Sequence, residues 1–240
     1  MIKTKKSLSQ NFLKDKNISK KITNITQLKN MVVLEIGPGY GFMTDNILEN
    51  KPKKLYIIEK DKSLITFLQK KYSDNKKVTI IEGDILRFNL NKFENLIIIS
   101  NLPYNISTKI ILYLFTYNKN ILEMVFMIQK EVAEKFDYNI KKMNKYKFLT
   151  KIMSFYFRYF EVSPKVFVPQ PKVKSTVVKF KFKKENIDIK KALFFSDLIF
   201  KNVRKKIYKN LNLEKTDNNI LNKRVNQLTI EELLWIYNFI

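Results

Sequence analysis

The sequence of 240 residues contains no cysteine and no histidine, and it has only four glycines and six prolines. Without cysteine the chain forms no disulfide and has no thiol nucleophile, and without histidine it has no imidazole base and no Ser-His triad. Zinc sites built from thiolate or imidazole ligands are excluded for the same reason. Chemistry in this chain must therefore depend on carboxylates, amides, tyrosines, lysines or a bound cofactor, and the sequence indicates no metal site.

Long apolar runs are also missing, since no stretch approaches the roughly 20 residues that a membrane-spanning helix needs. The basic N-terminus, MIKTKKSLSQNFL, lacks the long apolar core and the small-residue cleavage site of a secretory signal. We therefore expect a globular, cytoplasmic protein with no membrane partner. No pattern typical of a subunit interface is visible, so we expect a monomer.

Acidic residues are few beside basic ones: 46 Lys+Arg against 22 Asp+Glu give a formal net charge of +24. A field of this sign favours a polyanionic partner, nucleic acid before a membrane surface. The abundance of Lys, Asn, Ile, Phe and Tyr is also what an AT-rich genome produces. The charge alone does not decide between a nucleic-acid partner and compositional drift.

Short apolar runs alternate with segments of helical period in the first half of the chain. Nearly continuous runs, as in strands buried on both faces, occupy residues 31–36, 55–58, 78–81, 96–99 and 124–128. Helical segments occupy residues 42–48, 64–72 and 110–115. Strands joined by connections of helix length predict a parallel α/β sheet. Apolar residues at three- to four-residue steps from Phe12 to Leu28 predict a leading helix.

The second half of the chain has a different pattern. Two strands are predicted at 155–162 and 175–182, joined by the proline-rich stretch SPKVFVPQPKV. Beyond about Glu185, an apolar stripe from Leu193 to Ile207 and a second one over 228–240 predict helices. We therefore predict a first domain of residues 1–184 and a small helical C-terminal domain of residues 185–240.

Three of the four glycines, Gly37, Gly39 and Gly41, lie in EIGPGYG directly after the first predicted strand of the sheet. Glycine permits positive φ and the close approach of a ligand, and a glycine-rich turn opening a helix places that ligand at the carboxyl edge of a sheet. The spacing departs from G-x-G-x-x-G because Phe42 stands at the third position, which disfavours the pyrophosphate of NAD or FAD. An ordinary tight turn is the alternative.

Two acidic residues end the next two predicted strands. Glu59 follows the glycine loop by about twenty residues, where a carboxylate can accept both ribose hydroxyls. Asp84, after the fourth glycine, Gly83, can accept a hydrogen bond from an adenine amine. Either residue alone is better explained as a surface residue that caps the following helix. Together with the glycine loop they predict an adenosine site, and an adenosine cofactor without a pyrophosphate suggests S-adenosylmethionine.

The fourth predicted strand ends in Asn-Leu-Pro-Tyr, a combination that a plain turn does not require. Asn101 offers a side-chain carbonyl, Pro103 fixes the backbone so that the Leu102 carbonyl points outward, and the Tyr104 ring can stack on a base, a contact worth roughly 1–3 kcal/mol. Acceptors that hold the N–H bonds of an adenine amine out of the ring plane localise the nitrogen lone pair. Such an amine can attack a sulfonium methyl without a strong base.

Seven segments, in order, resemble the KsgA-type ribosomal RNA adenine N6-dimethyltransferases: QNFL, EIGPGYG, the glutamate of IIEKD, GD, NLPYNIST, QKEVAEKF and FVPQPKVKS. The resemblance runs from about residue 5 to 182, and FKNVRKKIYKNL and LTIEELL resemble the helical domain of that family. It implies a Rossmann-like methyltransferase domain with a mostly parallel seven-stranded sheet, followed by a helical rRNA-binding domain.

The resemblance also implies roles for individual residues. Contacts to S-adenosylmethionine are implied for Asn11, Leu13, Gly37, Gly39, Glu59, Asp84 and Asn101. Asn101, Leu102 and Tyr104 are implied to hold the target adenine, with Phe167 stacking on its other face. From the residues alone, Phe167 is a hairpin-loop aromatic of the kind more often found in a core.

The implied substrate is a pair of adjacent adenosines in the 3′-terminal hairpin loop of small-subunit rRNA, each methylated twice during ribosome biogenesis. Looped adenosines suit such a pocket because extruding them costs little pairing energy. Three positions depart from the family pattern: Ser9 and Lys147 stand where it usually has glycine, and Lys174 where it usually has aspartate. Basic residues of the last predicted domain, on one helical face, are candidates for rRNA phosphate contacts; they are Lys201, Arg204, Lys205, Lys206 and Lys209.

Two alternatives stay open. A large-subunit rRNA adenine methyltransferase of the macrolide-resistance type shares the fold and the chemistry and differs in its substrate. NLPY, QKEVAEKF and the C-terminal RKK segment favour the small-subunit enzyme. A non-catalytic nucleic-acid-binding relative would use the same scaffold without binding the cofactor.

Overall fold

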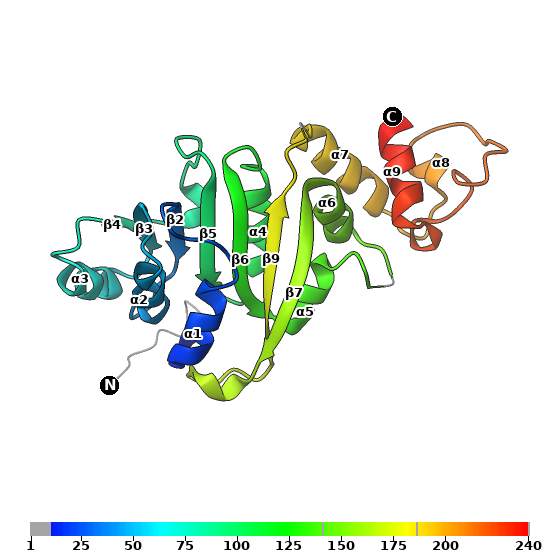
Figure 1. Cartoon of the computed structure of the whole chain (residues 1–240). Helices are drawn as coiled ribbons and strands as arrows, with labels where there is room; N and C mark the ends of the chain where they lie inside the picture. The colour runs from blue at the N-terminus through cyan, green and yellow to red at the C-terminus, as the bar shows by residue number, and fades with distance from the viewer. Residues whose placement is uncertain (1–10, 141, 186, 240) are drawn as a thin grey trace. The chain divides into compact units, whose positions relative to one another are not determined.

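The computed structural model describes residues 11–140, 142–185 and 187–239, and Figure 1 traces the chain. Its contacts form two compact units, which we describe separately. The N-terminal unit runs to Ala133 and includes Phe157–Phe182, and the C-terminal unit comprises Glu134–Tyr156 and the residues from Lys183 onward. These units divide the chain differently from the predicted ranges 1–184 and 185–240, because residues 134–156 pack with the C-terminal helices. The predicted domain ranges themselves stay a prediction.

The N-terminal unit is built on a seven-stranded sheet in the order β4-β3-β2-β5-β6-β9-β7. Strands β2 to β6 pair in parallel and β9 runs antiparallel to β6, so the predicted parallel α/β sheet is confirmed. Its strands are β2 (Val32–Ile36), β3 (Lys54–Glu59), β4 (Val78–Glu82), β5 (Leu96–Asn101), β6 (Ile121–Gln129), β7 (Ser154–Val162) and β9 (Ser175–Phe182). The strand order reverses between β2 and β5, which is where open α/β sheets bind ligands.

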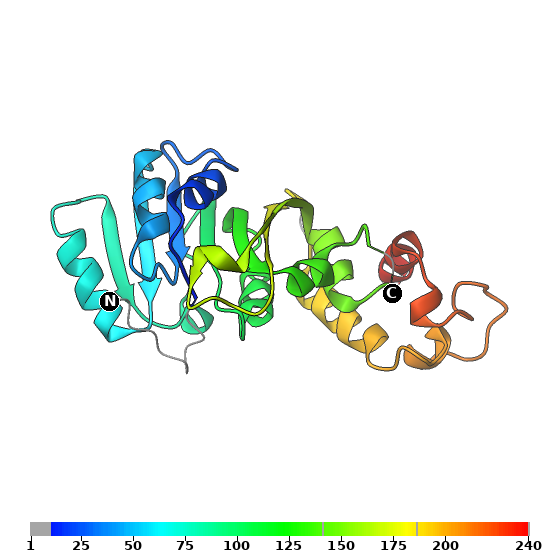
Figure 2. The same ribbon diagram turned by 90° about the horizontal axis from the view of Figure 1, so that it is seen from below.

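Helices cover both faces of this sheet, with α1 and α4 on opposite sides (Figures 1 and 2). The helices are α1 (Lys16–Thr23), α2 (Phe42–Glu49), α3 (Lys62–Lys71), α4 (Ser107–Phe115) and α5 (Lys130–Phe136), with a 3₁₀ turn η2 (Ile85–Arg87) after β4. On the α4 side, Phe115 meets Phe180 and Phe182 of β9 edge-on at 5.6 and 5.7 Å. All three rings are buried, which fixes this layer of the core.

The leading helix is shorter than the predicted run from Phe12 to Leu28. Asp15 caps α1 by accepting from the N–H groups of Asn17 and Ile18, which satisfies two donors of its first turn. Phe12 instead belongs to a two-residue strand, β1 (Phe12–Leu13), which pairs antiparallel with β8 (Phe167–Val168). The apolar period continued across this cap, so the sequence pattern did not separate strand from helix.

The C-terminal unit is mainly helical. Its helices are α6 (Lys145–Met153), α7 (Ile189–Phe200), α8 (Ile207–Asn210) and α9 (Ile230–Phe239), with 3₁₀ turn η4 (Val225–Gln227). The predicted stripe from Leu193 to Ile207 is not one helix, because the chain turns between Phe200 and Ile207. The basic residues of this stretch therefore lie mostly in turns rather than on a helical face. No helix in the described ranges is long and apolar enough to cross a membrane.

Two departures from the family pattern have local explanations. Lys147 is 3% exposed, and its ammonium donates to the carbonyls of Ile140 (2.8 Å) and Lys142 (3.2 Å); burial lowers its pKa. Lys174 pairs with Glu161 at 3.3 Å. Each side chain is therefore held by contacts of its own, and Ser9 lies outside the described residues.

We predict that adjacent residues of α7 differ sharply in their contribution to stability. Phe195 is 3% exposed and contacts the rings of Phe148 (5.0 Å) and Tyr237 (5.4 Å), so Phe195→Ala should lower the free energy of unfolding by about 3–5 kcal/mol. Phe194, 69% exposed, is the matched control, and Phe194→Ala should change it by less than about 0.5 kcal/mol. Urea unfolding followed by circular dichroism measures both; equal losses would refute this packing.

Candidate active site

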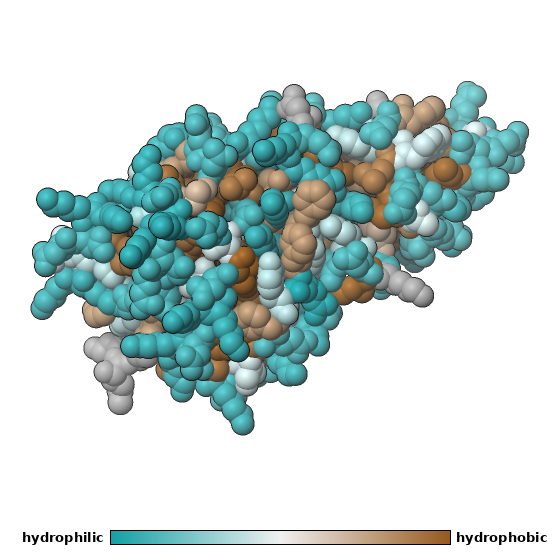
Figure 3. All heavy atoms as spheres, viewed as in Figure 1, coloured by the Kyte–Doolittle hydropathy of each residue, from teal (hydrophilic) through white to brown (hydrophobic). Residues whose placement is uncertain are grey.

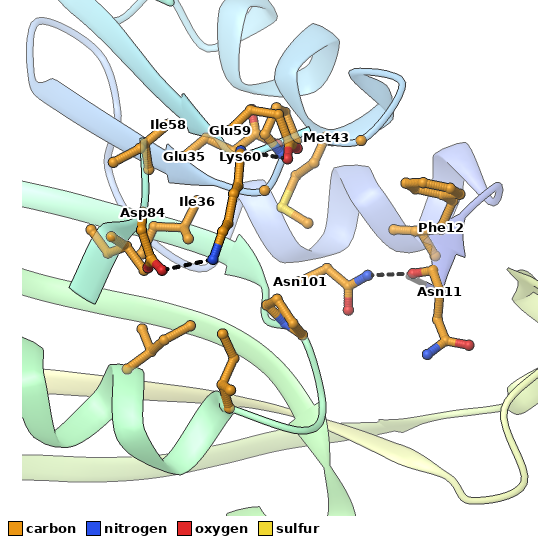
Figure 4. Close-up of a pocket in the computed structure, with 18 of the residues that line it drawn as sticks. Asn11, Phe12, Glu35, Ile36, Met43, Ile58, Glu59, Lys60, Asp84 and Asn101 are labelled. Carbon is orange, nitrogen blue, oxygen red and sulfur yellow. Dashed lines mark hydrogen bonds and ion pairs between the residues drawn. The ribbon is translucent and has the colours of Figure 1, made fainter. Parts of the chain in front are cut away.

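The carboxyl ends of β2, β3, β4 and β5 line one cavity of about 290 Å³ (Figure 4). Hydrogen bonds tie these strand ends together. The Gly37 N–H donates to the Ile58 carbonyl and the Gly83 N–H to the Glu59 carbonyl, both at 2.9 Å. The Ser100 hydroxyl of β5 donates to the Ile36 carbonyl of β2 at 2.6 Å. The cavity therefore opens at the reversal of strand order, with a wall of fixed geometry.

The glycine loop has the left-handed backbone that the sequence suggested, with φ of +62° at Gly37, +60° at Gly39 and +80° at Gly41. A Cβ added at Gly37 would meet nothing within 4 Å, whereas one at Gly39 would come 2.5 Å from the Phe12 ring. Gly39 therefore allows Phe12 to pack closely against the loop. Gly37 combines positive φ with open space beside the backbone, which suits the approach of a ligand.

Glu59 lies at the end of β3 and is 8% exposed. Its Oε1 accepts from the N–H groups of Lys60 (2.7 Å) and Asp61 (2.9 Å), and burial raises its pKa. The cap of α3 is Asp61, whose side chain accepts from the Ser63 N–H at 3.0 Å. The helix-cap explanation considered for Glu59 is therefore wrong, and its carboxylate lines the cavity.

Asp84 caps a turn, as one of its two explanations had it, and it also lines the cavity. Its Oδ1 accepts from the Leu86 N–H at 3.0 Å and so caps η2, while its Oδ2 lies 3.0 Å from the Lys60 ammonium (Figure 4). Partial burial acts to raise the pKa of Asp84, but the hydrogen bonds from Leu86 and Lys60 outweigh it and the pKa is lowered. An ionised carboxylate therefore stands at the cavity wall beside a lysine.

The Asn-Leu-Pro-Tyr segment holds a buried acceptor. The Asn101 amide donates through Nδ2 to the Asn11 carbonyl at 2.8 Å, and this bond turns its Oδ1 away from Asn11 (Figure 4). That oxygen is buried and, within the described part of the chain, has no hydrogen-bond partner. A buried orphan acceptor costs about 1–3 kcal/mol, so its retention points to a donor that arrives with a ligand.

Leu102 and Tyr104 are fixed by neighbouring strands. The Leu102 N–H donates to the Met127 carbonyl of β6 at 3.2 Å. The Tyr104 hydroxyl lies 2.6 Å from the Ser175 hydroxyl of β9, and burial raises its pKa. The phenol is therefore neutral near pH 7, and its ring is anchored at the hydroxyl end.

The predicted residues divide into two groups. Residues predicted to contact the cofactor all line the cavity: Asn11, Leu13, Gly37, Gly39, Glu59, Asp84 and Asn101. Of the residues predicted to hold the adenine, only Asn101 lines the cavity, whereas Leu102, Tyr104 and Phe167 lie outside its lining. Leu102 and Phe167 are 1% and 2% exposed. Phe167 pairs with Leu13 between β8 and β1, so its stacking role stays a prediction.

The sequence reasoning missed Glu35, a carboxyl in the cavity wall and 2% exposed. Its Oε2 accepts from the Thr44 hydroxyl at 2.6 Å, which ties β2 to α2. Burial raises the pKa of Glu35 to about 8, although the Thr44 hydrogen bond opposes the shift. The signal was present in MVVLEIGPG, where one acid interrupts a buried strand just before the glycine loop.

The chain matches the family model described as ribosomal RNA adenine dimethylase over residues 1–240. A ribosomal RNA small subunit methyltransferase A of Hydrogenobaculum sp. (strain Y04AAS1) is 36% identical over 244 residues, covering 99% of this chain and 94% of the relative. The protein of that name in Mycoplasma mobile is 41% identical over 215 residues, covering 86% and 82%.

Solved structures share the fold. A dimethyladenosine transferase from Plasmodium falciparum is 26% identical with a TM-score of 0.74, covering 95% of this chain and 98% of that one. The 23S rRNA methyltransferase ErmE has a TM-score of 0.79 at 20% identity, with the same coverage. The predicted Rossmann-like methyltransferase fold is thus confirmed.

We predict that Glu35 makes stability fall with rising pH. The carboxyl ionises near pH 4.5 when exposed but only near pH 8 in the folded chain. The contribution of the protonated carboxyl to the free energy of unfolding is therefore complete below about pH 4.5 and is lost as the pH rises through about 8. Glu35→Gln removes this loss. The free energy of unfolding of the variant minus that of the wild type should therefore increase by roughly 3–5 kcal/mol as the pH rises from 5 to 8.

Urea unfolding of both proteins at several pH values measures this difference. Glu94→Gln, at an exposed position, is the control and should follow the wild type. A constant difference between wild type and Glu35→Gln across this pH range would contradict the buried, protonated carboxyl.

Proposed function

This chain belongs to the ribosomal RNA adenine dimethylase family, and from that premise we propose that it methylates N6 of two adjacent adenosines in the 3′-terminal hairpin loop of small-subunit rRNA. The chain is an enzyme of the methyltransferase class. Relatives at 36% and 41% identity are named small subunit methyltransferases. That similarity favours small-subunit rRNA as the substrate over 23S rRNA, which the name of ErmE gives. The 20% identity with ErmE supports a shared fold alone.

The cavity suits S-adenosylmethionine as the methyl donor. Open space beside Gly37 accommodates a ligand against the backbone, and the buried Glu59 carboxylate offers an acceptor for the ribose hydroxyls. Asp84 can accept a hydrogen bond from the adenine amine. Its Oδ2 would then either bind Lys60 and the amine together or lose its contact with Lys60. Asn11, Leu13, Gly39 and Asn101 complete the proposed contacts.

The unpartnered Oδ1 of Asn101 is the observation that carries the proposed chemistry. An exocyclic amine of adenine is a donor of the kind that this oxygen lacks. The Asn11 carbonyl holds the other end of the amide, so the oxygen is oriented before the base arrives. Preorganised dipoles of this sort contribute to rate because they need no reorganisation during the reaction.

The remaining residues of the segment position the base. We assign to the Leu102 carbonyl the role of second acceptor, and to the Tyr104 ring that of stacking surface, anchored by Ser175. Phe167 would reach the opposite face of the base only if it left the β1–β8 pair, so its contribution depends on movement of that segment.

The proposed transfer needs no strong base. When bound, S-adenosylmethionine supplies an electrophilic methyl group on a sulfonium sulfur. Asn101 and Leu102 hold the amine so that its lone pair points at that methyl, and positioning at roughly 3–3.5 Å supplies much of the rate. Transfer would break the bond between the donor sulfur and its methyl carbon as the N–C bond forms, leaving a neutral thioether, and the amine proton, acidic from that point, would pass to solvent. Repetition on the same nitrogen gives the dimethylated product.

We predict that the protein transfers label from S-adenosylmethionine to unmethylated small ribosomal subunits, with N6,N6-dimethyladenosine as the product. Naked large-subunit rRNA, assayed separately, should remain unlabelled. Mass spectrometry of the digested RNA identifies the nucleoside. Label confined to the large-subunit RNA would assign the protein to the resistance type. Absence of both transfer and cofactor binding would indicate a non-catalytic relative.

We predict that Asn101→Ala lowers kcat for methyl transfer by about 100-fold or more, as expected for loss of a preorganised polar group. Tyr104→Ala should lower kcat/KM by about 5- to 150-fold through lost stacking, while Tyr104→Phe keeps the ring and should retain most activity. Single-turnover kinetics and calorimetric titration with S-adenosylmethionine separate chemistry from cofactor affinity. Asn139→Ala, at an exposed position, is the control, and normal kcat in Asn101→Ala would refute the assigned role.

A further inference from the structure

The edge strand β7 exposes aromatic side chains on one side. Phe155, Phe157 and Tyr159 alternate along the strand and are 50%, 45% and 46% exposed. Tyr156, on the other side, is 5% exposed, so this position packs into the core. Figure 3 shows brown, apolar atoms reaching the surface over β7. Aromatic rings so open to solvent on a sheet face mark a contact surface.

Lysines of β9 lie on this same side of the sheet. β9 is the neighbour of β7 and runs in the opposite direction (Figure 1). The Lys183 N–H donates to the Met153 carbonyl at 3.0 Å, and counting along the ladder from this pair brings Phe157 opposite Lys179. Burial agrees with this register in one pair, because Tyr156 then lies opposite Phe180 and both side chains are buried.

A glutamate on this side is held between two lysines of β9. Glu123 of β6 lies 2.8 Å from the Lys179 ammonium and 4.0 Å from that of Lys181. Thr26, which follows α1, also donates to Glu123, so the turn after α1 covers this part of β6. The two lysines and one carboxylate leave a single net positive charge beside Phe157, and the Lys181 side chain is 52% exposed.

Like Glu123 with Lys179 and Lys181, a second glutamate forms a charged trio with two lysines, at the end of β7 beyond Phe157 and Tyr159. Glu161, two residues after Tyr159 on the same side of β7, lies 2.7 Å from the Lys130 ammonium and 3.3 Å from that of Lys174. The hydrogen bonds from these lysines lower the pKa of Glu161, so it stays ionised. This trio also carries one net positive charge.

The charge pattern identifies the occupant. Phe157 and Tyr159 lie between two groups that are each net positive, on a chain of formal net charge +24, so a polyanion with flat apolar rings is complementary to them. A second copy of this chain would bring the same positive charge and be repelled. Single-stranded RNA has both features, since its phosphates suit the lysines and its bases stack on aromatic rings.

We propose that Phe157 and Tyr159, flanked by the Glu123 and Glu161 trios, form a stacking platform for unpaired nucleotides of the RNA substrate. The platform lies outside the residues that line the cofactor cavity. The inference rests on the proposed function, because it takes the substrate to be RNA. It adds a second contact that grips nucleotides which are not themselves methylated.

Binding of a fluorescent eight-nucleotide oligouridine, measured by anisotropy with the full chain, tests the platform. This probe contains no adenine, so it does not report on the adenine site. The double variant Phe157→Leu/Tyr159→Leu keeps apolar side chains but removes both rings, and it should weaken binding at least tenfold. The exchanged variant Phe157→Tyr/Tyr159→Phe keeps two rings and should bind within about twofold of the wild type.

Two further variants sharpen the test. Phe67→Leu removes another exposed ring of the same unit, 42% exposed, and should leave oligouridine affinity unchanged. Lys181→Gln should reduce the slope of log affinity against log salt by about one. Equal affinity of wild type and the double leucine variant would overturn the proposal. So would sedimentation showing a dimer that the leucine variant dissociates, since the face would then be a protein interface.

Failure of the platform and failure of the proposed function are separable. Methyl transfer by the wild type to small subunits together with unchanged oligouridine binding by the leucine variant would overturn the platform alone. Ring-dependent binding in a protein that transfers no methyl group would support the platform and overturn the enzymatic proposal.

Discussion

The site depends on one constraint, namely that four parallel strands end at the same edge and their last polar groups must be satisfied there. Backbone and hydroxyl donors of Gly37, Gly83 and Ser100 meet the carbonyls of the adjacent strands, so each strand end is locked to its neighbour. Residues just beyond these bonds then fall at fixed positions around the cavity. Glu59, Asp84 and Asn101 converge because of the ladder, although they are far apart in the sequence.

The sheet and the residues that line the cavity could be predicted because their signals are local. Continuous apolar runs gave five strands within a residue or a few of their observed limits, and glycines and acids at strand ends gave the cavity. The ends of helices that are set by a capping side chain were harder to predict from the sequence. Asp15 starts α1 by taking two N–H groups, and nothing in the apolar period of Phe12 distinguishes a strand before that cap from a first helical turn.

Other features required tertiary information. Glu35 is an ordinary acid in the sequence, and only its burial raises its pKa enough to make it neutral near pH 7, against the opposing effect of the Thr44 hydrogen bond. Lys147 looked like a departure from a family glycine, yet its ammonium satisfies two carbonyls of the preceding turn. Phe167 matches a substrate-contacting position by resemblance but packs in the core. These cases show where a residue's type alone is ambiguous and its neighbours decide.

The short strand β1 and the residue before it connect parts of the site that come from distant segments of the chain. Asn11 and the two residues of β1 that follow it touch three separate parts: the Asn11 carbonyl holds the Asn101 amide, Phe12 packs against Gly39, and Leu13 pairs with Phe167. A shift of any one residue of so short a strand moves the other two. In the proposed function, a Phe167 that left the β1–β8 pair to meet a base would also take away the pairing partner of Leu13, next to the residues that hold Asn101 and pack on Gly39.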